Sequence, residues 1–261
     1  MSPMNVIVCV KQIPDPAAPG ALDGATNTLK RDGKLILDDS DAYGVEMALQ
    51  LVDKAGGGEV SLVSMAPNSE TSGLRTALAM GAAKGVLVSD PALQGSDALT
   101  TAKVLAAAIK RMGGADLIIG ATESSDGYTG TVPEQMAEVL GLPSVTFAKK
   151  LTITGSSLKA DRQTEEGYDE VECPLPAVIS VTAGVVEPRY PSFKGIMAAK
   201  SKPIDTFTAA DLGVSPTGWA GAGQKVVAVT QAEARQAGEV IEDDGNAFNK
   251  IVSFLENLKV I

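Results

Sequence analysis

A polar loop rich in glycine, serine and threonine carries the clearest chemistry in this sequence. A short apolar run at residues 116–119 ends at Gly120 and is followed by ATESSDGYTGT at residues 121–131. Apolar residues then recur at the spacing of a helix packed on a sheet: Val132, Met136, Val139 and Leu140. A strand, a small-residue loop and the start of a helix together favour binding of an anion by backbone amides, and a nucleotide phosphate fits this arrangement.

The same loop lacks a positive charge. Residues 121–131 contain no lysine or arginine, and the GxxxxGK[ST] pattern of a P-loop is missing. This favours holding a nucleotide over cleaving it and counts against an adenylating or pyrophosphate-cleaving enzyme. Asp126 would repel phosphate unless its carboxylate points to a ribose hydroxyl or caps the helix amides. Taken alone, the stretch fits an ordinary polar turn with a helix cap equally well.

Two residue types limit the reactions that the chain could catalyse. It has no histidine, which excludes Ser-His-Asp and Cys-His nucleophiles and histidine-ligated zinc. Its two cysteines, Cys9 and Cys173, show no CxxC spacing, which excludes a disulfide scaffold and an iron–sulfur cluster. Cys9 lies in an apolar run, where a small buried thiol is expected. We therefore expect neither catalytic residues nor a metal site.

Composition and charge are those of a globular protein. The 261 residues, 44% hydrophobic and 21% charged, suffice for one large α/β domain with an appendage or two small domains. A net charge of −10 without a basic tract argues against nucleic acid and against an anionic membrane surface. No apolar run approaches the ~18 residues of a membrane span, and no signal-peptide layout is present. We expect a soluble, cytoplasmic protein of bacterial type, without a targeting peptide or membrane insertion.

The order of the segments predicts an α/β fold with a doubly wound, mostly parallel sheet. Apolar runs at residues 4–10, 60–65, 85–88 and 116–119 are typical of strands, and amphipathic stretches separate them. Four strands alternating with helices require parallel pairing with right-handed crossovers. In such sheets ligands bind at the carboxyl ends of the strands, where strand order reverses. The ends of the first and fourth strands are therefore our candidates, with residues 38–41 and Met65 on the same edge.

The remaining segments extend this core. Residues 12–33 carry three prolines and three glycines, which predicts a long excursion with one hairpin near residues 29–37. After Pro143, short β-like runs indicate antiparallel hairpins added to the sheet. A glycine-rich stretch from Leu212 is typical of an extended linker. It leads to an amphipathic helix capped by Asp243 and Asp244, with the apolar stripe Phe248, Ile251, Val252, Leu255 and Leu258.

The segment GVVEPRYPSFKGIMAAKSKPI, residues 184–204, combines apolar and basic side chains. On an acidic protein this combination suggests a docking surface for an acidic partner. We divide the chain into a nucleotide-binding α/β domain, residues 1–204, and a C-terminal arm with a helix, residues 205–261. The helix is expected to dock on a globular body, either the chain's own domain or a partner subunit. The candidate docking residues are Arg189, Tyr190, Phe193, Lys194, Ile196 and Met197.

With this segment the sequence resembles the β subunit of electron-transfer flavoproteins. The characteristic stretch is EPRY followed by IM and a basic run. The other matching motifs, in the family's order, are VKQIPD at residues 10–15, VEMAL at 45–49, RTALAMGA at 75–82, DGYTG at 126–130 and LPAV at 175–178. Together the matches span residues 4–214, and the set is specific where each single motif is not.

The resemblance implies a heterodimer with an α subunit that holds most of the redox-active FAD. The β subunit would contribute a Rossmann-like domain, similar also to the adenine nucleotide α-hydrolase fold, and a buried structural AMP. It would act as an electron carrier without catalytic residues, taking electrons from acyl-CoA or other flavoprotein dehydrogenases in fatty acid oxidation. It would pass them to a quinone oxidoreductase and so towards the respiratory chain.

The resemblance also places the sites. The partner-recognition loop maps to residues 181–203. The AMP contacts map to Cys9, Asp38, Asp39, Ser40, Asp41, Met65, Ala121, Thr122, Glu123, Ser124, Ser125, Asp126, Gly127, Tyr128, Thr129, Gly130, Thr131 and Val132.

Two departures from the family's pattern leave the nucleotide open. Asp38 stands where some relatives have Asn, and Tyr128 stands where electron-bifurcating relatives usually have Asp. A second FAD in place of AMP, as in bifurcating flavoproteins, is therefore one alternative. A stand-alone adenosine-nucleotide-binding module of the stress-protein kind is another, although residues 184–204 and the hairpins after Pro143 count against it.

Overall fold

The computed structural model describes residues 3–18, 20–230, 232–233 and 238–261. The chain divides into two compact units, Met1–Val227 and Ala228–Ile261. This boundary lies beyond the division at residue 204 drawn from the sequence, because the segment after residue 204 still pairs with and packs on the first unit.

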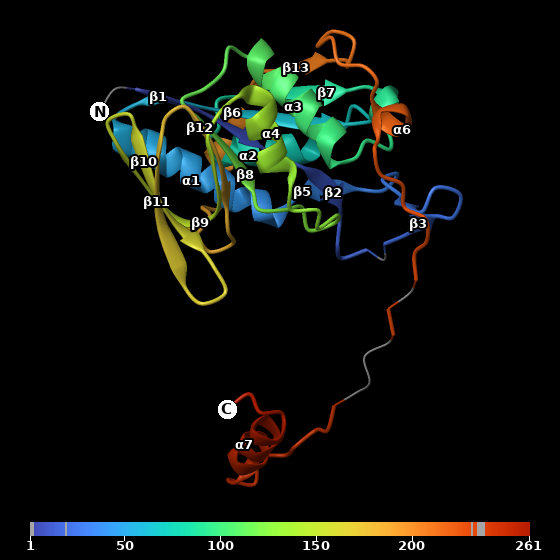
Figure 1. The fold of residues 1–261 in the computed structure, drawn as a ribbon, viewed down its shortest axis with the longest axis vertical. Helices are drawn as coiled ribbons and strands as arrows, with labels where there is room; N and C mark the ends of the chain where they lie inside the picture. Colours follow the sequence, from blue (N-terminus) through green and yellow to red (C-terminus); the bar gives the residue numbers. More distant parts are fainter. Residues whose placement is uncertain (1–2, 19, 231, 234–237) are drawn as a thin grey trace. The chain divides into compact units, whose positions relative to one another are not determined.

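A nine-stranded sheet forms the centre of the first unit (Figure 1). Its order is β11-β10-β9-β12-β8-β1-β6-β7-β13. Neighbouring strands from β9 to β13 pair in parallel, while β10 and β11 are antiparallel. The predicted sheet with added hairpins is confirmed. The strands are β1 (Met4–Cys9), β6 (Gly58–Ala66), β7 (Lys84–Ser89), β8 (Leu117–Ala121), β9 (Ser144–Thr154), β10 (Ser157–Gln163), β11 (Tyr168–Pro174), β12 (Ala177–Val181) and β13 (Ile204–Phe207).

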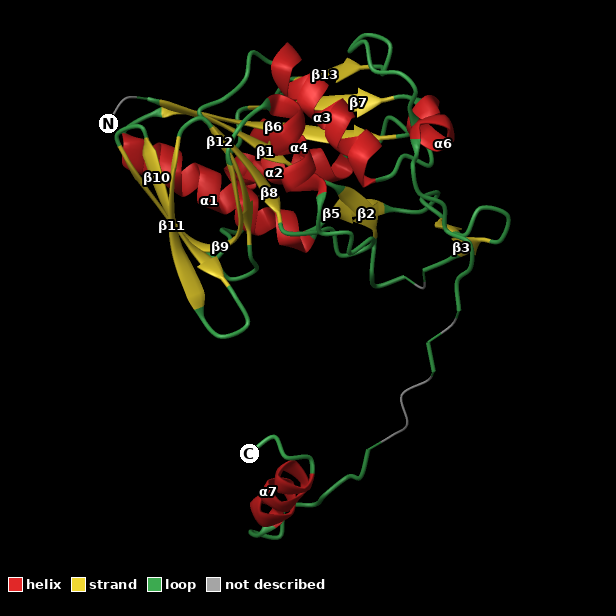
Figure 2. Ribbon diagram, viewed as in Figure 1, coloured by secondary structure: helices red, strands yellow, loops and turns green. Residues whose placement is uncertain are grey.

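Helices cover both faces of the sheet, as the red and yellow elements of Figure 2 show. On one face α1 (Asp39–Ala55) and α2 (Ser72–Met80) share an apolar core with Val6 and Val8 of β1. On the other face α3 (Ala98–Arg111) and α4 (Val132–Leu140) share a second core with Ile7. Alternate residues of β1 enter opposite cores because side chains in a strand point to alternate faces.

The helix ends follow ordinary capping chemistry. Asp38 is the N-cap of α1, where its Oδ1 accepts a hydrogen bond from the Ser40 amide at 3.0 Å. Gly56 ends the helix in the left-handed conformation, with φ of 81°. Helix α4, like α2, has no side-chain cap: its N-cap residue, Thr131, makes no such bond, so the Val132 and Glu134 amides stay available to a ligand, while Pro133 has no N–H.

The excursion after β1 contains two small antiparallel pairs where the sequence predicted one hairpin. Strands β2 (Gln12–Pro14) and β5 (Leu35–Leu37) pair together, as do β3 (Leu22–Asp23) and β4 (Thr28–Leu29) between them. The predicted hairpin at residues 29–37 is wrong, because Ile13, Leu35 and Leu37 are each buried in the outer pair.

Two further details correct the sequence-based assignment. Residues 144–154 form one strand, β9, where two short runs were expected, because Lys149 and Lys150 face solvent without interrupting it. The glycine-rich stretch is not a free linker throughout, because a short helix, α6 (Gly218–Gly221), packs on a 3-10 turn, η1 (Pro91–Leu93). Trp219 lies against Gly95, where a Cβ would come within 2.1 Å of the indole.

The second unit contains α7 (Ala247–Asn257), which confirms the predicted terminal helix. Asp243 and Asp244 do not cap it: they accept hydrogen bonds from the amides of Gly245 and Asn246, both at 2.9 Å and both before the helix. The N-cap is Asn246, without a side-chain bond. Within the described residues, none of the helices combines the length and the apolar character that crossing a membrane requires.

Candidate functional site

The point where strand order reverses lies between β1 and β8. The helix after β1 covers one face and the helix after β8 covers the other, so the two connections separate at the carboxyl edge of the sheet. Residues 121–131 leave β8 at this point, and residues 38–41 begin α1 beside them. This is the edge where doubly wound sheets bind ligands.

Asp38 binds the loop directly. Its carboxylate is fully buried, and Oδ2 accepts a hydrogen bond from the Ser125 amide at 2.7 Å while Oδ1 caps α1. Its own amide donates to the Lys11 carbonyl at 3.0 Å. Asp38 therefore connects the start of α1, the end of β1 and the polar loop. Both of its oxygens already have protein donors, so its role at the site is to hold the loop in place.

Asp126 is neutralised by two cations that the loop itself does not contain. Lys11 Nζ lies 2.6 Å from Asp126 Oδ1 and 3.1 Å from Ser124 Oγ. The Arg31 guanidinium pairs with the other carboxylate oxygen, and the Asp126 side chain is only 6% exposed. Burial by itself disfavours the charged carboxylate, but Lys11 and Arg31 outweigh it and lower the pKa of Asp126. The expected repulsion of a phosphate by Asp126 is thereby reduced.

Asp41 is a third carboxyl group at this edge, in a different environment. It is buried and accepts a hydrogen bond from the Lys11 amide at 2.5 Å. Burial raises the pKa of Asp41 well above its usual value, against the effect of that bond, and the nearby Asp38 and Asp126 raise it further. Of the remaining two residues in the 38–41 turn, Asp39 is exposed and Ser40 is half-buried.

Cys9 ends β1 opposite Val63 of the neighbouring strand β6, and Met65 lies two residues further along β6. The Cys9 thiol points towards α4, with Sγ 3.8 Å from Met136 Sδ. Burial, with a smaller contribution from Asp41, raises the pKa of Cys9 to about 12. The thiol stays protonated at neutral pH and is a poor nucleophile, as expected from its apolar strand.

Glycines in the loop at residues 121–131 leave room for a ligand to come close to its backbone. Gly130 has a φ of 68° and precedes the uncapped start of α4. A Cβ on Gly127 would lie 3.1 Å from Ser124 Oγ and 3.7 Å from Lys11 Nζ. Tyr128 adopts a φ of 49° with its ring 68% exposed, a conformation that is uncommon for a bulky residue. In the described residues, Glu134 Oε2 and Gln135 Oε1 of the first turn are buried without a hydrogen-bond partner.

The structure thus brings the predicted nucleotide residues to one edge, together with Lys11 from the predicted end of the first strand, and adds Arg31, which sequence reasoning missed. Lys11 directly follows the predicted first strand in the VKQIPD motif, so its position pointed to this edge. Arg31 comes from the excursion, and no local pattern in the sequence indicated that it would return to the loop. Thr122, a predicted AMP contact, binds the neighbouring strand β12 instead: its amide and its hydroxyl both donate to the Val181 carbonyl, at 3.2 and 3.1 Å.

The predicted docking segment contains a short helix, α5 (Phe193–Ala199), in place of an open loop. Ser192 caps it through Oγ, which accepts from the Gly195 amide at 3.0 Å. Tyr190 is 94% exposed and Phe193 80% exposed, so neither ring belongs to the core of this chain. Ile196 and Met197 are exposed beside them.

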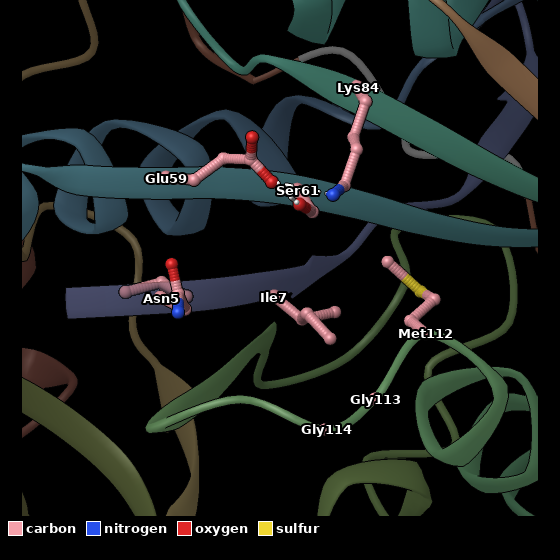
Figure 3. Close-up of a pocket in the computed structure, with 9 residues that line it drawn as sticks. Asn5, Ile7, Glu59, Ser61, Lys84, Met112, Gly113 and Gly114 are labelled. Atoms are coloured by element: carbon pink, nitrogen blue, oxygen red, sulfur yellow. Dashed lines mark hydrogen bonds and ion pairs between the residues drawn. The ribbon is translucent and has the colours of Figure 1, made fainter.

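A cavity of about 230 Å³ lies at the opposite, amino edge of the sheet. Figure 3 shows Glu59, Ser61 and Lys84 on one side of it and Met112 with the adjacent glycines on the other. Lys84 Nζ and Ser61 Oγ both bind Glu59 Oε1, at 2.7 and 3.1 Å, so its charges are paired. We assign no ligand to this cavity, because ligands of doubly wound sheets bind at the other edge. No cluster of metal-ligating side chains occurs among the described residues.

The fold and its carboxyl edge define a doubly wound α/β subunit, and comparisons with known proteins specify the family. Residues 26–212 match the family model for the electron transfer flavoprotein domain. The chain is 40% identical to electron transfer flavoprotein subunit beta of Mycobacterium tuberculosis, covering 98% of this chain and 99% of the relative. It is 36% identical to the subunit beta of Thermoanaerobacterium thermosaccharolyticum, with 98% of each covered.

A further relative is the caffeyl-CoA reductase-Etf complex subunit CarD of Acetobacterium woodii, 37% identical over 82% of this chain and 81% of the relative. The chain therefore belongs to the β-subunit family of electron transfer flavoproteins, and its function is electron transfer.

Proposed function

We propose that this chain is the β subunit of a heterodimer in which an α subunit holds most of the FAD. In this proposal the carboxyl edge of the β-subunit sheet binds AMP in a structural role. The surface around Phe193 docks flavoprotein dehydrogenases, such as acyl-CoA dehydrogenases, whose electrons pass through the FAD to a quinone oxidoreductase. The flavin supplies the redox chemistry, and the residues of this chain bind and position.

The observation that carries the nucleotide proposal is the neutralised loop at residues 121–131. Asp38 fixes its backbone, and Lys11 and Arg31 balance Asp126. The first-turn amides of α4 have no side-chain cap. A phosphate placed there would accept hydrogen bonds from the Val132 and Glu134 amides, since Pro133 has no N–H, and would meet the positive end of the helix dipole.

The test is to identify the nucleotides that the purified α–β complex releases on denaturation, by mass and absorbance. We expect one FAD and one AMP per heterodimer. Two FAD molecules would replace the AMP proposal by the bifurcating alternative. FAD alone, with no second nucleotide, would remove the ligand assignment from this edge.

The exposed aromatic and aliphatic side chains of residues 184–204 support a protein partner over a stand-alone nucleotide module. Neighbouring apolar groups exposed on one short segment are typical of an interaction site. The name of the Acetobacterium woodii relative places that protein in a complex with a CoA-ester reductase, which supports a partner of this class.

A further inference from the structure

The docking segment is fixed to α1 by one arginine. Arg189 Nε donates to Glu46 Oε2 at 2.6 Å, and a terminal guanidinium nitrogen donates to Oε1 at 3.1 Å. The Arg189 amide adds a longer bond to Oε2 at 3.3 Å. Glu46 is 3% exposed, so this two-pronged pair is shielded from water on the carboxylate side. Backbone and side chain of Arg189 are thus both held by a single carboxylate.

The other end of the segment is fixed to α2. Arg75 donates to the carbonyls of Ala199 and Lys202, at 2.7 and 2.6 Å. Lys202 Nζ in turn donates to the carbonyls of Leu78 and Ala82 at the end of α2, at 2.8 and 2.6 Å. Carbonyl groups at and just after the end of a helix have no N–H donor within that helix, and these bonds supply one.

Close packing completes the attachment. Gly195 of α5 lies so near α2 that a Cβ there would come within 2.4 Å of the Ala79 carbonyl oxygen. Between the two attachments, the segment presents Tyr190 and Phe193 to solvent. The exposed rings therefore belong to a segment that is bound to the rest of the chain at both ends.

This arrangement changes the roles of the basic residues in the segment. Arg189 and Lys202 donate hydrogen bonds to groups within this chain, while Lys194 and Lys200 remain exposed. The cations available to attract an acidic partner are then Lys194 and Lys200. Arg189 stands directly before Tyr190, so its attachment to α1 fixes the backbone from which that ring extends.

We infer that Glu46 is a positioning residue for partner docking, acting through Arg189 to hold the apolar residues of the segment in their binding arrangement. This inference rests on the proposed docking function. A segment held in its bound conformation before contact loses less conformational freedom on association, which favours affinity. Glu46 itself touches no partner, because its carboxylate is buried beneath Arg189.

A purely structural role for Glu46 is the competing explanation. It predicts that a Glu46 variant lowers the stability or the flavin content of the protein and affects electron transfer only in proportion. A positioning role predicts a specific change in docking in a protein that is otherwise intact. The two explanations are separated by measuring the KM for the carrier and kcat apart from the melting temperature.

The experiment compares Glu46→Gln with Asp53→Asn in the purified α–β complex. Gln keeps the size of the side chain but removes the charge and one of the two acceptor oxygens. Asp53 is the matched control, because it also faces Arg189 but at 3.8 Å and with its side chain 73% exposed. Amide hydrogen exchange of residues 185–198 reports the order of the segment, and steady-state electron transfer from an acyl-CoA dehydrogenase reports docking.

We expect Glu46→Gln to speed exchange in the segment and to raise the KM for the carrier about tenfold, with kcat and flavin content unchanged. Asp53→Asn should do neither. Unchanged exchange and KM in Glu46→Gln would overturn the inference, as would a loss explained entirely by a lower melting temperature or less flavin. Phe193→Ala, measured in parallel, separates a failure of the docking function from a failure of the positioning role. If it leaves the KM unchanged, the docking function itself fails; if it raises the KM and Glu46→Gln does not, only the positioning role fails.

Discussion

Lys11 and Asp126 lie 115 residues apart in the chain, and their side chains meet at 2.6 Å on the carboxyl edge of the sheet. This ion pair supplies, from two residues after the end of β1, the positive charge that the loop at residues 121–131 lacks. Through its amide, Lys11 also binds Asp41 at 2.5 Å. Lys11 thus donates hydrogen bonds to two of the three acidic groups at this edge, and its carbonyl accepts one from the amide of the third, Asp38.

Replacing Lys11 with Met should destabilise the protein and lower its nucleotide content. Asp126 would keep only Arg31 as a partner while its side chain stays buried, at a cost of about 1–2 kcal/mol, or about 3–6 °C in melting temperature. Lys34→Met is the control, because Lys34 also pairs with a carboxylate, Asp15, at 3.0 Å but is 75% exposed. Equal melting temperatures for the two variants would contradict the proposed role of Lys11.

The carboxyl groups of Asp41 and Asp126 should give opposite pH dependences. The pKa of Asp126 is lowered in the folded state, so its contribution to stability is present above about pH 4 and is lost as the pH falls through the folded pKa. The pKa of Asp41 is raised, so its contribution is present below about pH 4 and is lost as the pH rises through the folded pKa. Relative to wild type, Asp41→Asn should therefore gain stability as the pH rises from 4 to 8, in melting experiments across that range. A pH-independent difference would show that Asp41 titrates normally.

Alanine variants of Gly130 and Gly141 separate an effect on nucleotide binding from an effect of backbone strain. They flank α4 with nearly equal φ values, 68° and 70°, and a Cβ at Gly141 would meet nothing within 4 Å. Alanine at either position should cost about 1 kcal/mol through the left-handed conformation. Only Gly130→Ala should also lower the AMP content of the complex, because it lies at the phosphate-facing end of the helix. Equal AMP content in the two variants would remove Gly130 from the site.

The parts of the fold that the sequence predicted best are those fixed by local patterns. The four strands predicted at residues 4–10, 60–65, 85–88 and 116–119 follow from apolar periodicity, and so does the terminal helix α7. The pairing of β2 with β5 could not be predicted in this way, because strand pairing across a long excursion depends on which apolar residues the core accepts. The same holds for Arg31, whose partner Asp126 lies 95 residues away.

In the candidate sites, too, features set by local patterns could be predicted and contacts between distant residues could not. Glycines, serines and the strand end located the polar loop, but no local pattern indicated that both carboxylate oxygens of Asp38 would accept hydrogen bonds from backbone amides. In the docking segment, the exposed apolar residues were identified from composition. The internal bonds of Arg189 and Lys202 could not be predicted, because their partners, Glu46 and the end of α2, are distant in sequence.

Phe193 should anchor the dehydrogenase partner. Its side chain is 80% exposed at the first position of α5, and burying such a ring in a partner's pocket is typically worth ~2 kcal/mol or more, about a thirtyfold change in affinity. Phe193→Ala should raise the Kd for the dehydrogenase accordingly, without lowering the melting temperature. Lys194→Ala, at the next position, should mainly reduce the association rate and its salt dependence. An unchanged Kd for Phe193→Ala would exclude this ring from the interface.

The terminal helix α7 should dock on the α subunit. Its apolar residues Phe248, Ile251 and Phe254 are 51–61% exposed within a unit of 34 residues, Ala228–Ile261, that has little core of its own. An isolated helix of 11 residues is marginal in water, so we expect the amides of α7 to exchange rapidly in the lone chain and to be protected in the α–β complex. Combined Phe248→Ala and Ile251→Ala substitution should weaken the heterodimer at least about tenfold, since each ring or branched side chain contributes about 1.5–3 kcal/mol when buried. Asn249→Ala with Lys250→Ala is the matched control on the same helix and should leave the Kd of the heterodimer unchanged. If α7 exchanges equally fast with and without the α subunit, the helix has no place in that interface.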